Sequence, residues 1–174
     1  MIPKINHILY ATDLSENSAY TFRYAINSAE KHDAKIHILH VQDRIPASLE
    51  ALLKTNPPTE NWEAYDQNKN EQMKKYIHKR LEAFCQREFK YYPTFMNRIA
   101  SIEVVNGDPA GEILQKADDL KADLVVMGTH GKGLLAHAFL GSVAEKVLNR
   151  IKIPVFIIPL PEKTDISFSD VQKP

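Results

Sequence analysis

The chain has 174 residues, 44% of them hydrophobic, and this length and composition suit a single domain with a sizeable core. Lysine and arginine together number 22, aspartate and glutamate together also number 22, and the formal net charge is zero. A balanced charge argues against a nucleic-acid binder that relies on a basic face.

The N-terminal residues and the apolar segments give an expectation for location. Residues 1–7 lack the charged and apolar sections of a signal peptide, and no apolar run reaches the roughly 18 residues that a membrane-spanning helix needs. We therefore expect a cytoplasmic protein without membrane insertion. Cys85 is the only cysteine, and its place in a helical apolar pattern predicts a packed structural thiol.

The first predicted strand covers residues 5–11 and is mostly apolar, as expected for a parallel strand covered on both faces. Asp13 follows directly after it, at the position where open α/β sheets bind ligands. The side chain of Asp13 can also cap the next turn or helix, and the two roles are compatible. A helix with one apolar face is predicted from Ser15 to about Lys31.

The second predicted strand, residues 36–41, carries two histidines. His37 and His40 are three residues apart, so on a strand their side chains point to opposite faces. This spacing favours two separately packed or exposed histidines over a pair of metal ligands.

The segment 43–68 differs in character from the rest of the chain. Prolines and polar residues interrupt it, which is compatible with a short helix over the mouth of a site or with a loop. We expect an irregular insertion. Beyond it, an apolar pattern through Ile77, Leu81 and Cys85 predicts a long helix with a charged outer surface.

The third predicted strand covers residues 101–105, and turn-forming residues follow it. Gly107 suggests an unusual φ angle, and Asp108 is a candidate helix cap. Pro109 fits the first helical position, because the N–H of that position has no partner within the helix.

The fourth predicted strand begins at Asp123 and leads into a loop that contains glycines. After Gly128, two residues precede Gly131, and nine further residues precede Gly141 and Ser142, where an amphipathic segment begins. Glycines permit positive φ angles and a close approach of the main chain to a ligand, and a helix start offers unpaired amides to an anion. The pattern predicts phosphate binding at this loop.

Two other phosphate motifs do not fit this region. Residues 131–136 satisfy the dinucleotide pattern G-x-G-x-x-G/A, but they follow the fourth strand and lack an acidic residue about 20 positions later. Gly128 and Gly133 have the spacing of a P-loop, yet Leu134 and Leu135 occupy the positions of its Lys and Ser/Thr.

The fifth predicted strand covers residues 154–158, and the prolines at its two ends favour an edge strand. The polar segment 162–174 is expected to be disordered. Alternating strands and helices predict a parallel sheet with helices on both faces, joined by right-handed crossovers.

Three parts of the sequence resemble the universal stress protein family, in its nucleotide-binding (ATP-binding) branch. They are Ile8-Leu9-Tyr10-Ala11-Thr12-Asp13, the spacing Gly128-x2-Gly131-x9-Gly141-Ser142, and Pro154-Val155-Phe156-Ile157-Ile158. The resemblance implies one universal stress protein domain over residues 1–161. It also implies an adenine nucleotide alpha hydrolase-like fold, an open five-stranded parallel sheet of order 3-2-1-4-5. In that order Asp13 and the glycine loop meet at the crevice between the first and fourth strands.

The resemblance further implies a site for ATP or another adenine nucleotide. Asp13 and Val41 would contact adenosine, while Met127 and Gly128 would lie along the ribose and the first phosphate. The phosphate chain would be held by His130, Gly131, Gly141, Ser142 and Val143. Mg²⁺ or Mn²⁺ would be bound chiefly by phosphate oxygens, because no carboxylate cluster occurs near the loop.

In the resemblance, the last strand (154–159) pairs with its counterpart in a homodimer. Nucleotide occupancy would then bias the dimer or an exposed loop toward an unidentified protein partner in a stress response. Two alternatives stay open. One is a slow ATPase, although no catalytic base is evident near the expected γ-phosphate. The other is a dimerisation scaffold with a vestigial loop, which the presence of Ser142 and all three glycines argues against.

Overall fold

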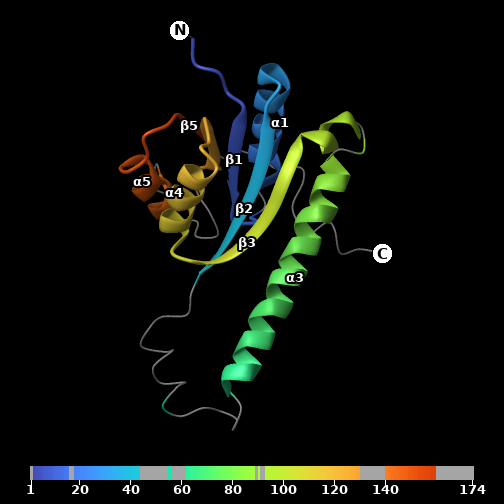
Figure 1. Ribbon diagram of the computed structural model, residues 1–174, viewed down its shortest axis with the longest axis vertical. Coiled ribbons are helices and arrows are strands. Elements are labelled where there is room, and N and C mark those ends of the chain that lie inside the picture. Colours follow the sequence, from blue (N-terminus) through green and yellow to red (C-terminus); the bar gives the residue numbers. More distant parts are fainter. Residues whose placement is uncertain are drawn as a thin grey trace.

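The computed structural model describes residues 2–15, 18–43, 55, 62–88, 90, 93–129 and 140–159. Its strands are β1 (His7–Thr12), β2 (Lys35–Asp43), β3 (Ile99–Gly107), β4 (Leu124–Gly128) and β5 (Val155–Ile158). They form a parallel sheet of five strands in the order β3-β2-β1-β4-β5 (Figure 1). The predicted fold class and strand order are confirmed.

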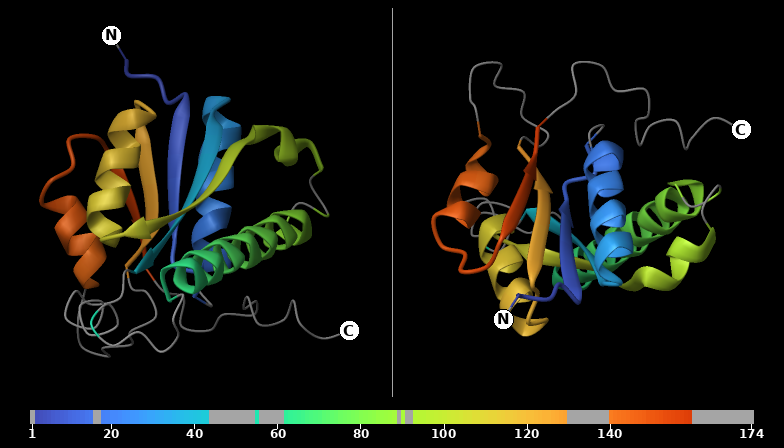
Figure 2. Two further views of the ribbon diagram at one scale, coloured as in Figure 1. Left: turned by 60° about the horizontal axis from the view of Figure 1, so that its bottom comes forward. Right: turned by 90° about the horizontal axis from the view of Figure 1, so that it is seen from above.

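Helices cover both faces of this sheet. They are α1 (Ser18–His32), α3 (Trp62–Glu88), α4 (Pro109–Asp119) and α5 (Ser142–Leu148), with a 3₁₀ helix, η1 (Pro93–Arg98), before β3. Figure 2 shows α1 and α3 on one face, and α4 and α5 on the other. None of the described helices combines the length and the apolar composition that crossing a membrane requires.

The alternation of side chains along the central strands divides the core into two parts. Tyr10 of β1 points toward α1 and α3, where it packs among Phe22 and Phe84. The neighbouring Leu9 points the other way, toward α4 and α5. Cys85 is fully buried in α3, so the thiol is a packed core group, as predicted. Both faces of β1 are therefore buried, as its continuous apolar sequence requires.

Several predicted boundaries differ from the structure by a few residues, most clearly those of α3 and β3. Helix α3 begins at Trp62, inside the segment 43–68 that we expected to be irregular. Its sequence contains neither glycine nor proline, so nothing in it interrupts a helix once the chain has passed Pro58. Strand β3 is longer than predicted, because Asn106 and Gly107 continue the ladder opposite Gln42 and Asp43. Residues 44–54, 56–61 and 162–174 lie outside the described part of the chain.

The turn from β3 into α4 confirms the predicted cap and corrects the predicted role of glycine. The Asp108 side chain accepts a hydrogen bond from the Gly111 amide at 2.9 Å, and Pro109 occupies the first helical turn. No described glycine has a positive φ, so Gly107 does not supply an unusual φ angle. A β-carbon there would collide with the Glu112 side chain, so a larger residue at this position would require that side chain to move.

Candidate functional site

The carboxyl ends of all five strands lie at one edge of the sheet, because the strands are parallel. From β1 the chain passes through α1 to β2 on one side, whereas β4 pairs with β1 on the other side. The carboxyl ends of β1 and β4 thus mark the topological switch point, the usual ligand-binding place in open α/β sheets. Asp13, Gly128 and the start of α5 all belong to this edge.

Asp13 directly follows β1 and is half-buried. Its Oδ1 accepts hydrogen bonds from the Ser15 amide at 3.1 Å and from the Ser18 hydroxyl at 3.2 Å. Its Oδ2 is shielded from solvent and has no hydrogen-bond partner. One oxygen therefore performs the predicted capping of the β1–α1 turn, while the other stays available to a donor. An unsatisfied buried acceptor costs about 1–3 kcal/mol unless something binds to it.

The turn that carries Asp13 is held rigidly. The hydroxyl of Tyr10 donates to the Ser18 carbonyl at 2.7 Å. Complete burial raises the pKa of Tyr10 far above its ordinary value, so this phenol stays a donor at neutral pH. Leu14 has φ 61°, in the left-handed region that a leucine rarely adopts, and its amide donates to the Thr12 hydroxyl at 3.2 Å. Such local strain concentrates at functional sites, and no motif in the sequence indicates it.

The end of β2 lies beside the Asp13 turn. His40 is buried and its Nδ1 donates to the Thr12 carbonyl at 2.7 Å, which ties β2 to the last residue of β1. Val41, predicted to contact adenosine, is half-buried and packs with the core under α4 and α5. Val41 and Asp13 therefore lie at the carboxyl ends of adjacent strands. Val41 contributes an apolar surface there, and Asp13 contributes a free carboxylate oxygen.

A hydrogen bond joins the end of β4 to the start of α5. Thr129 follows Gly128, and its amide donates to the Ile158 carbonyl at 3.0 Å. Its carbonyl in turn accepts from the Gly141 amide at 2.7 Å. This contact places the start of α5 beside the end of β4, as the predicted loop required. Met127 is buried and Gly128 is half-buried at the same end.

The free amides at this end differ in part from those that we expected to bind an anion. The Gly141 amide is engaged by Thr129, so it is not free for a phosphate. Gly141 is the N-cap of α5 with φ −71° and makes no side-chain cap, which corrects the expectation of a positive φ. Ser142 and Val143 occupy the first two helical positions, whose amides have no partner within a helix. His130 and Gly131 lie outside the described residues.

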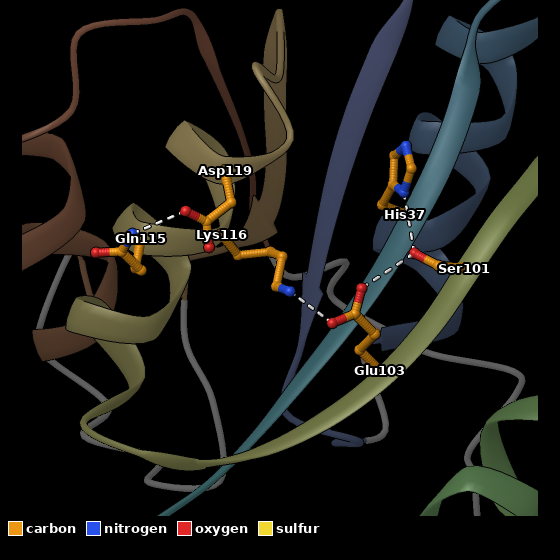
Figure 3. Close-up of polar contacts among 6 residues, drawn as sticks. All are labelled: His37, Ser101, Glu103, Gln115, Lys116 and Asp119. Atoms are coloured by element: carbon orange, nitrogen blue, oxygen red, sulfur yellow. Dashed lines mark hydrogen bonds and ion pairs between the residues drawn. The ribbon is translucent and has the colours of Figure 1, made fainter.

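The histidines of β2 take separate roles. His37 lies on the face covered by α4, and its Nδ1 lies 2.9 Å from the Ser101 hydroxyl. The Ser101 hydroxyl donates to Glu103, and Lys116 donates to the other oxygen of Glu103 at 2.6 Å (Figure 3). His40 belongs to the opposite face. Within the described ranges, no three residues of the types that bind metals are grouped to hold an ion.

Burial affects the charge state of His37, the first residue of the polar chain His37–Ser101–Glu103–Lys116. Partial burial, together with the neighbouring His7, lowers the pKa of His37. Because Ser101 donates to Glu103, the hydroxyl accepts from Nδ1–H of His37. The Nε2 of neutral His37 then accepts from Nδ1 of His7, 3.3 Å away. Each side chain in this series makes a hydrogen bond to the next, and the series therefore links β1, β2, β3 and α4.

The fold, the order of strands and this edge together define a chain of the universal stress protein type. A model of the universal stress protein family matches residues 4–159, and the chain belongs to that family. Universal stress protein MJ0531 of Methanocaldococcus jannaschii is 31% identical over 156 residues, which are 90% of this chain and 83% of that protein.

Solved structures show the same fold. Protein MJ0577 of the same organism has a TM-score of 0.64 at 24% identity, covering 92% of this chain and all of that one. A universal stress protein in complex with cAMP has a TM-score of 0.51 at 24% identity, covering 90% of this chain and 98% of that one.

Two residues at this edge escaped the sequence analysis. The side-chain oxygens of Gln42 and Asn106 are shielded from solvent and, like Asp13 Oδ2, have no hydrogen-bond partner. Both residues lie near the carboxyl ends of their strands, β2 and β3. Because both strands also carry other polar residues, no sequence signal singles these two out.

Proposed function

We propose that this protein binds an adenine nucleotide, ATP in the first place, at the carboxyl edge of the sheet. Occupancy of the site would regulate the protein in a stress response. Membership of the universal stress protein family supports the proposal, as does the relative that was solved in complex with cAMP. In this proposal residues 1–161 act as one domain.

The proposed contacts follow the positions of the residues along the edge. Asp13 and Val41 would receive adenosine, and Met127 and Gly128 would border the ribose and the first phosphate. The phosphates would meet His130, Gly131, Ser142 and Val143, with Gly141 allowing their close approach. Mg²⁺ or Mn²⁺ would be bound through phosphate oxygens.

The observation that carries the proposal is the free Oδ2 of Asp13. A carboxylate oxygen that is out of water, unpartnered and located at a switch point needs a donor from outside the chain. The hydroxyls of a ribose are such donors. The start of α5 at the neighbouring strand end offers the amides and dipole that favour phosphate. One molecule that carries both groups is a nucleotide.

Asp13→Asn tests this assignment without removing the turn. The amide oxygen of asparagine can accept from Ser15 and Ser18 as Oδ1 does, whereas its NH₂ group replaces the free acceptor by a donor. We expect calorimetry on nucleotide-stripped protein to show ATP binding, and the variant to bind about tenfold more weakly or worse, since a hydrogen bond to a charged group contributes about 1.5–3 kcal/mol.

The control is Asp119→Asn on α4, an exposed carboxylate that accepts a hydrogen bond from Gln115. This variant should bind ATP as the wild type does. Absence of ATP binding by the wild-type protein at millimolar ligand would sink the proposal. Equal affinities of the wild type and Asp13→Asn would remove Asp13 from the site.

We further propose that β5 pairs with its counterpart in a homodimer. β5 is the last strand of the described sheet, and Phe156 on it is 42% exposed. An open strand edge with an exposed aromatic ring is a typical pairing surface. Phe156→Lys should therefore lower the mass measured by light scattering from that of a dimer to that of a monomer.

Met96→Lys is the matched control, because Met96 is 39% exposed on η1, away from β5. It should leave the mass unchanged. A wild-type protein that is monomeric at tens of micromolar, or a Phe156→Lys variant that remains dimeric, would contradict the dimer.

A further inference from the structure

Two histidines of neighbouring strands face each other at the amino end of the sheet. His7 begins β1, and the register pairs His37 of β2 with Leu9, two residues beyond His7. Because side chains alternate along a strand, His7, Leu9 and His37 leave the same face, the one covered by α4 and α5. His7 is exposed and His37 is half-buried, so the pair is open to solvent.

The distance between the two rings fits a shared metal ion. Nδ1 of His7 lies 3.3 Å from Nε2 of His37, and the ring centroids are 5.5 Å apart. This distance is longer than the roughly 2.7–3.2 Å of ordinary N–H···O hydrogen bonds. Two nitrogens at about 2.0–2.1 Å from a tetrahedral zinc ion are about 3.3–3.4 Å apart. Ligands at a right angle, as in square-planar copper sites, would be only about 2.9 Å apart.

The polar chain already orients His37 as a metal ligand. Nδ1–H of His37 donates to the Ser101 hydroxyl, which donates to Glu103, and Glu103 is held by Lys116. Figure 3 shows one ring nitrogen of His37 turned to Ser101 and the other on the far side of the ring. This tautomer leaves the lone pair on Nε2. Histidines that bind metals are usually fixed in this way, by a hydrogen bond from the nitrogen that does not bind the metal.

His7 can supply the second nitrogen. Because the ring is exposed, solvent can move its hydrogen from Nδ1 to Nε2 without a change of net charge, which leaves the lone pair on Nδ1. Asp123 accepts from the His7 amide at 3.0 Å, which fixes the backbone and places a carboxylate beside the pair. Among the described residues, no third side chain completes a group of ligands. Water would therefore occupy the remaining positions on the metal.

We propose that Nδ1 of His7 and Nε2 of His37 bind Zn²⁺ in a tetrahedral site completed by two water molecules. The ion replaces the long hydrogen bond between the two rings and joins β1 to β2. Ser101 is a positioning residue, because it acts on the metal only through His37. The site lies at the amino end of the strands, opposite to the proposed nucleotide site, and does not depend on the proposed function.

Calorimetry with ZnCl₂ tests the site on protein that carries no affinity tag and has been stripped of metals by a chelator. The wild type should bind one ion per chain. His7→Gln and His37→Gln each remove one of the two protein ligands and should weaken binding at least about tenfold. Ser101→Ala keeps both ligands but removes the acceptor that fixes the ring of His37, and it should also cost about tenfold in affinity.

Two further readouts separate a built site from weak binding to any histidine. Co²⁺ absorbs visible light far more strongly in a tetrahedral site than in an octahedral one, so the wild type with Co²⁺ should show strong visible bands that His7→Gln lacks. Zn²⁺ should raise the melting temperature of the wild type by mass action, but not that of His7→Gln. His32→Gln is the matched control, because it removes an exposed histidine from the last turn of α1. It should bind Zn²⁺ as the wild type does.

The outcomes decide the inference without touching nucleotide binding. A wild type that binds no Zn²⁺ at millimolar metal, or a His7→Gln protein that binds it as tightly as the wild type, would overturn the site. An octahedral Co²⁺ spectrum would overturn it as well. Because the His7 side chain is exposed, His7→Gln should fold as the wild type does, and it decides the question even if His37→Gln fails to fold.

Discussion

The two ends of the sheet treat their polar groups in opposite ways. At the amino end, Asp123 accepts from the amides of Asn6 and His7 at 2.7 and 3.0 Å, and His37 belongs to a hydrogen-bonded chain without a gap. At the carboxyl end, Asp13, Gln42 and Asn106 each keep a shielded oxygen without a partner. The same strands thus carry a satisfied end and an unsatisfied end.

This difference separates polar groups that stabilise the fold from polar groups that are available to the proposed ligand. A buried acceptor that is already bonded gains nothing from a ligand, whereas an unpartnered one gains the full value of a new hydrogen bond. The strained φ of Leu14 lies at the unsatisfied end as well. Substitutions at the amino end should therefore change stability, and substitutions at the carboxyl end should change binding.

The largest expected effect is on stability at the amino end. Asp123→Ala removes the acceptor of two backbone amides and should lower the free energy of unfolding by about 2 kcal/mol. Urea denaturation measures this change, and ATP affinity should stay within about twofold of the wild type under folded conditions. Asp123→Asn, which keeps an acceptor oxygen, should recover most of the stability. A loss of ATP affinity in a folded Asp123→Ala protein would contradict the division between the ends.

The next effect concerns Gly141 at the carboxyl end. Its φ of −71° and ψ of 154° suit any residue, and serine is a good N-cap, so Gly141→Ser should keep or slightly raise stability. In the proposed site, the added side chain would occupy the space through which phosphates would approach Ser142 and Val143. We expect ATP affinity to fall about tenfold or more, a change of about 1.4 kcal/mol.

Calorimetry and thermal unfolding of the same preparation check this prediction. The comparison variant is Gly107→Ser, at the end of β3, where a side chain would collide with Glu112. That variant should lose stability by about 1 kcal/mol through overpacking. If Gly141→Ser binds ATP as tightly as the wild type, glycine is not required for close approach at position 141.

A smaller effect is expected from the ion pair that closes the polar chain. Lys116 donates to Glu103 at 2.6 Å, and the two side chains are 23% and 35% exposed. Glu103→Gln should cost about 1 kcal/mol of stability, because it weakens this contact and the contact to Ser101. Lys121→Met breaks the far more exposed pair with Asp118, 81% and 78% exposed, and should change stability by less than about 0.5 kcal/mol. Equal effects of the two variants would contradict the bracing role of Glu103.

The strand order could be foreseen, because the alternation of strands and helices is a local signal that a resemblance could extend. The glycine spacing predicts a site at the carboxyl edge, and that part stays a prediction. The length of β3 could not, since Asn106 and Gly107 look like turn residues and are strand residues only through their pairing with β2. The engaged amide of Gly141 and the left-handed Leu14 depend on contacts across the chain. No periodicity in the sequence reports such contacts.

The smallest effect is the pH dependence that His37 imposes on stability. Burial, helped by His7 and Lys116 and opposed by Glu103, lowers the pKa of His37 below its ordinary value of about 6.5. Below that value the unfolded chain takes up the proton before the folded one does, so stability falls as the pH drops from 7 toward 5. When Nε2 of His37 is protonated, it can no longer accept the hydrogen bond from His7. The loss of this hydrogen bond contributes to the same loss of stability.

Denaturant titrations at pH 8, 7, 6 and 5 measure this dependence. His37→Gln has no proton to take up, so its stability should decline less between pH 7 and pH 5 than that of the wild type. His32→Gln, which removes an exposed histidine from the last turn of α1, controls for the loss of a histidine. If the wild type and His37→Gln decline in parallel, His37 is not the group that couples the amino end of the sheet to pH. A steeper decline in the variant would contradict the direction of the pKa shift itself.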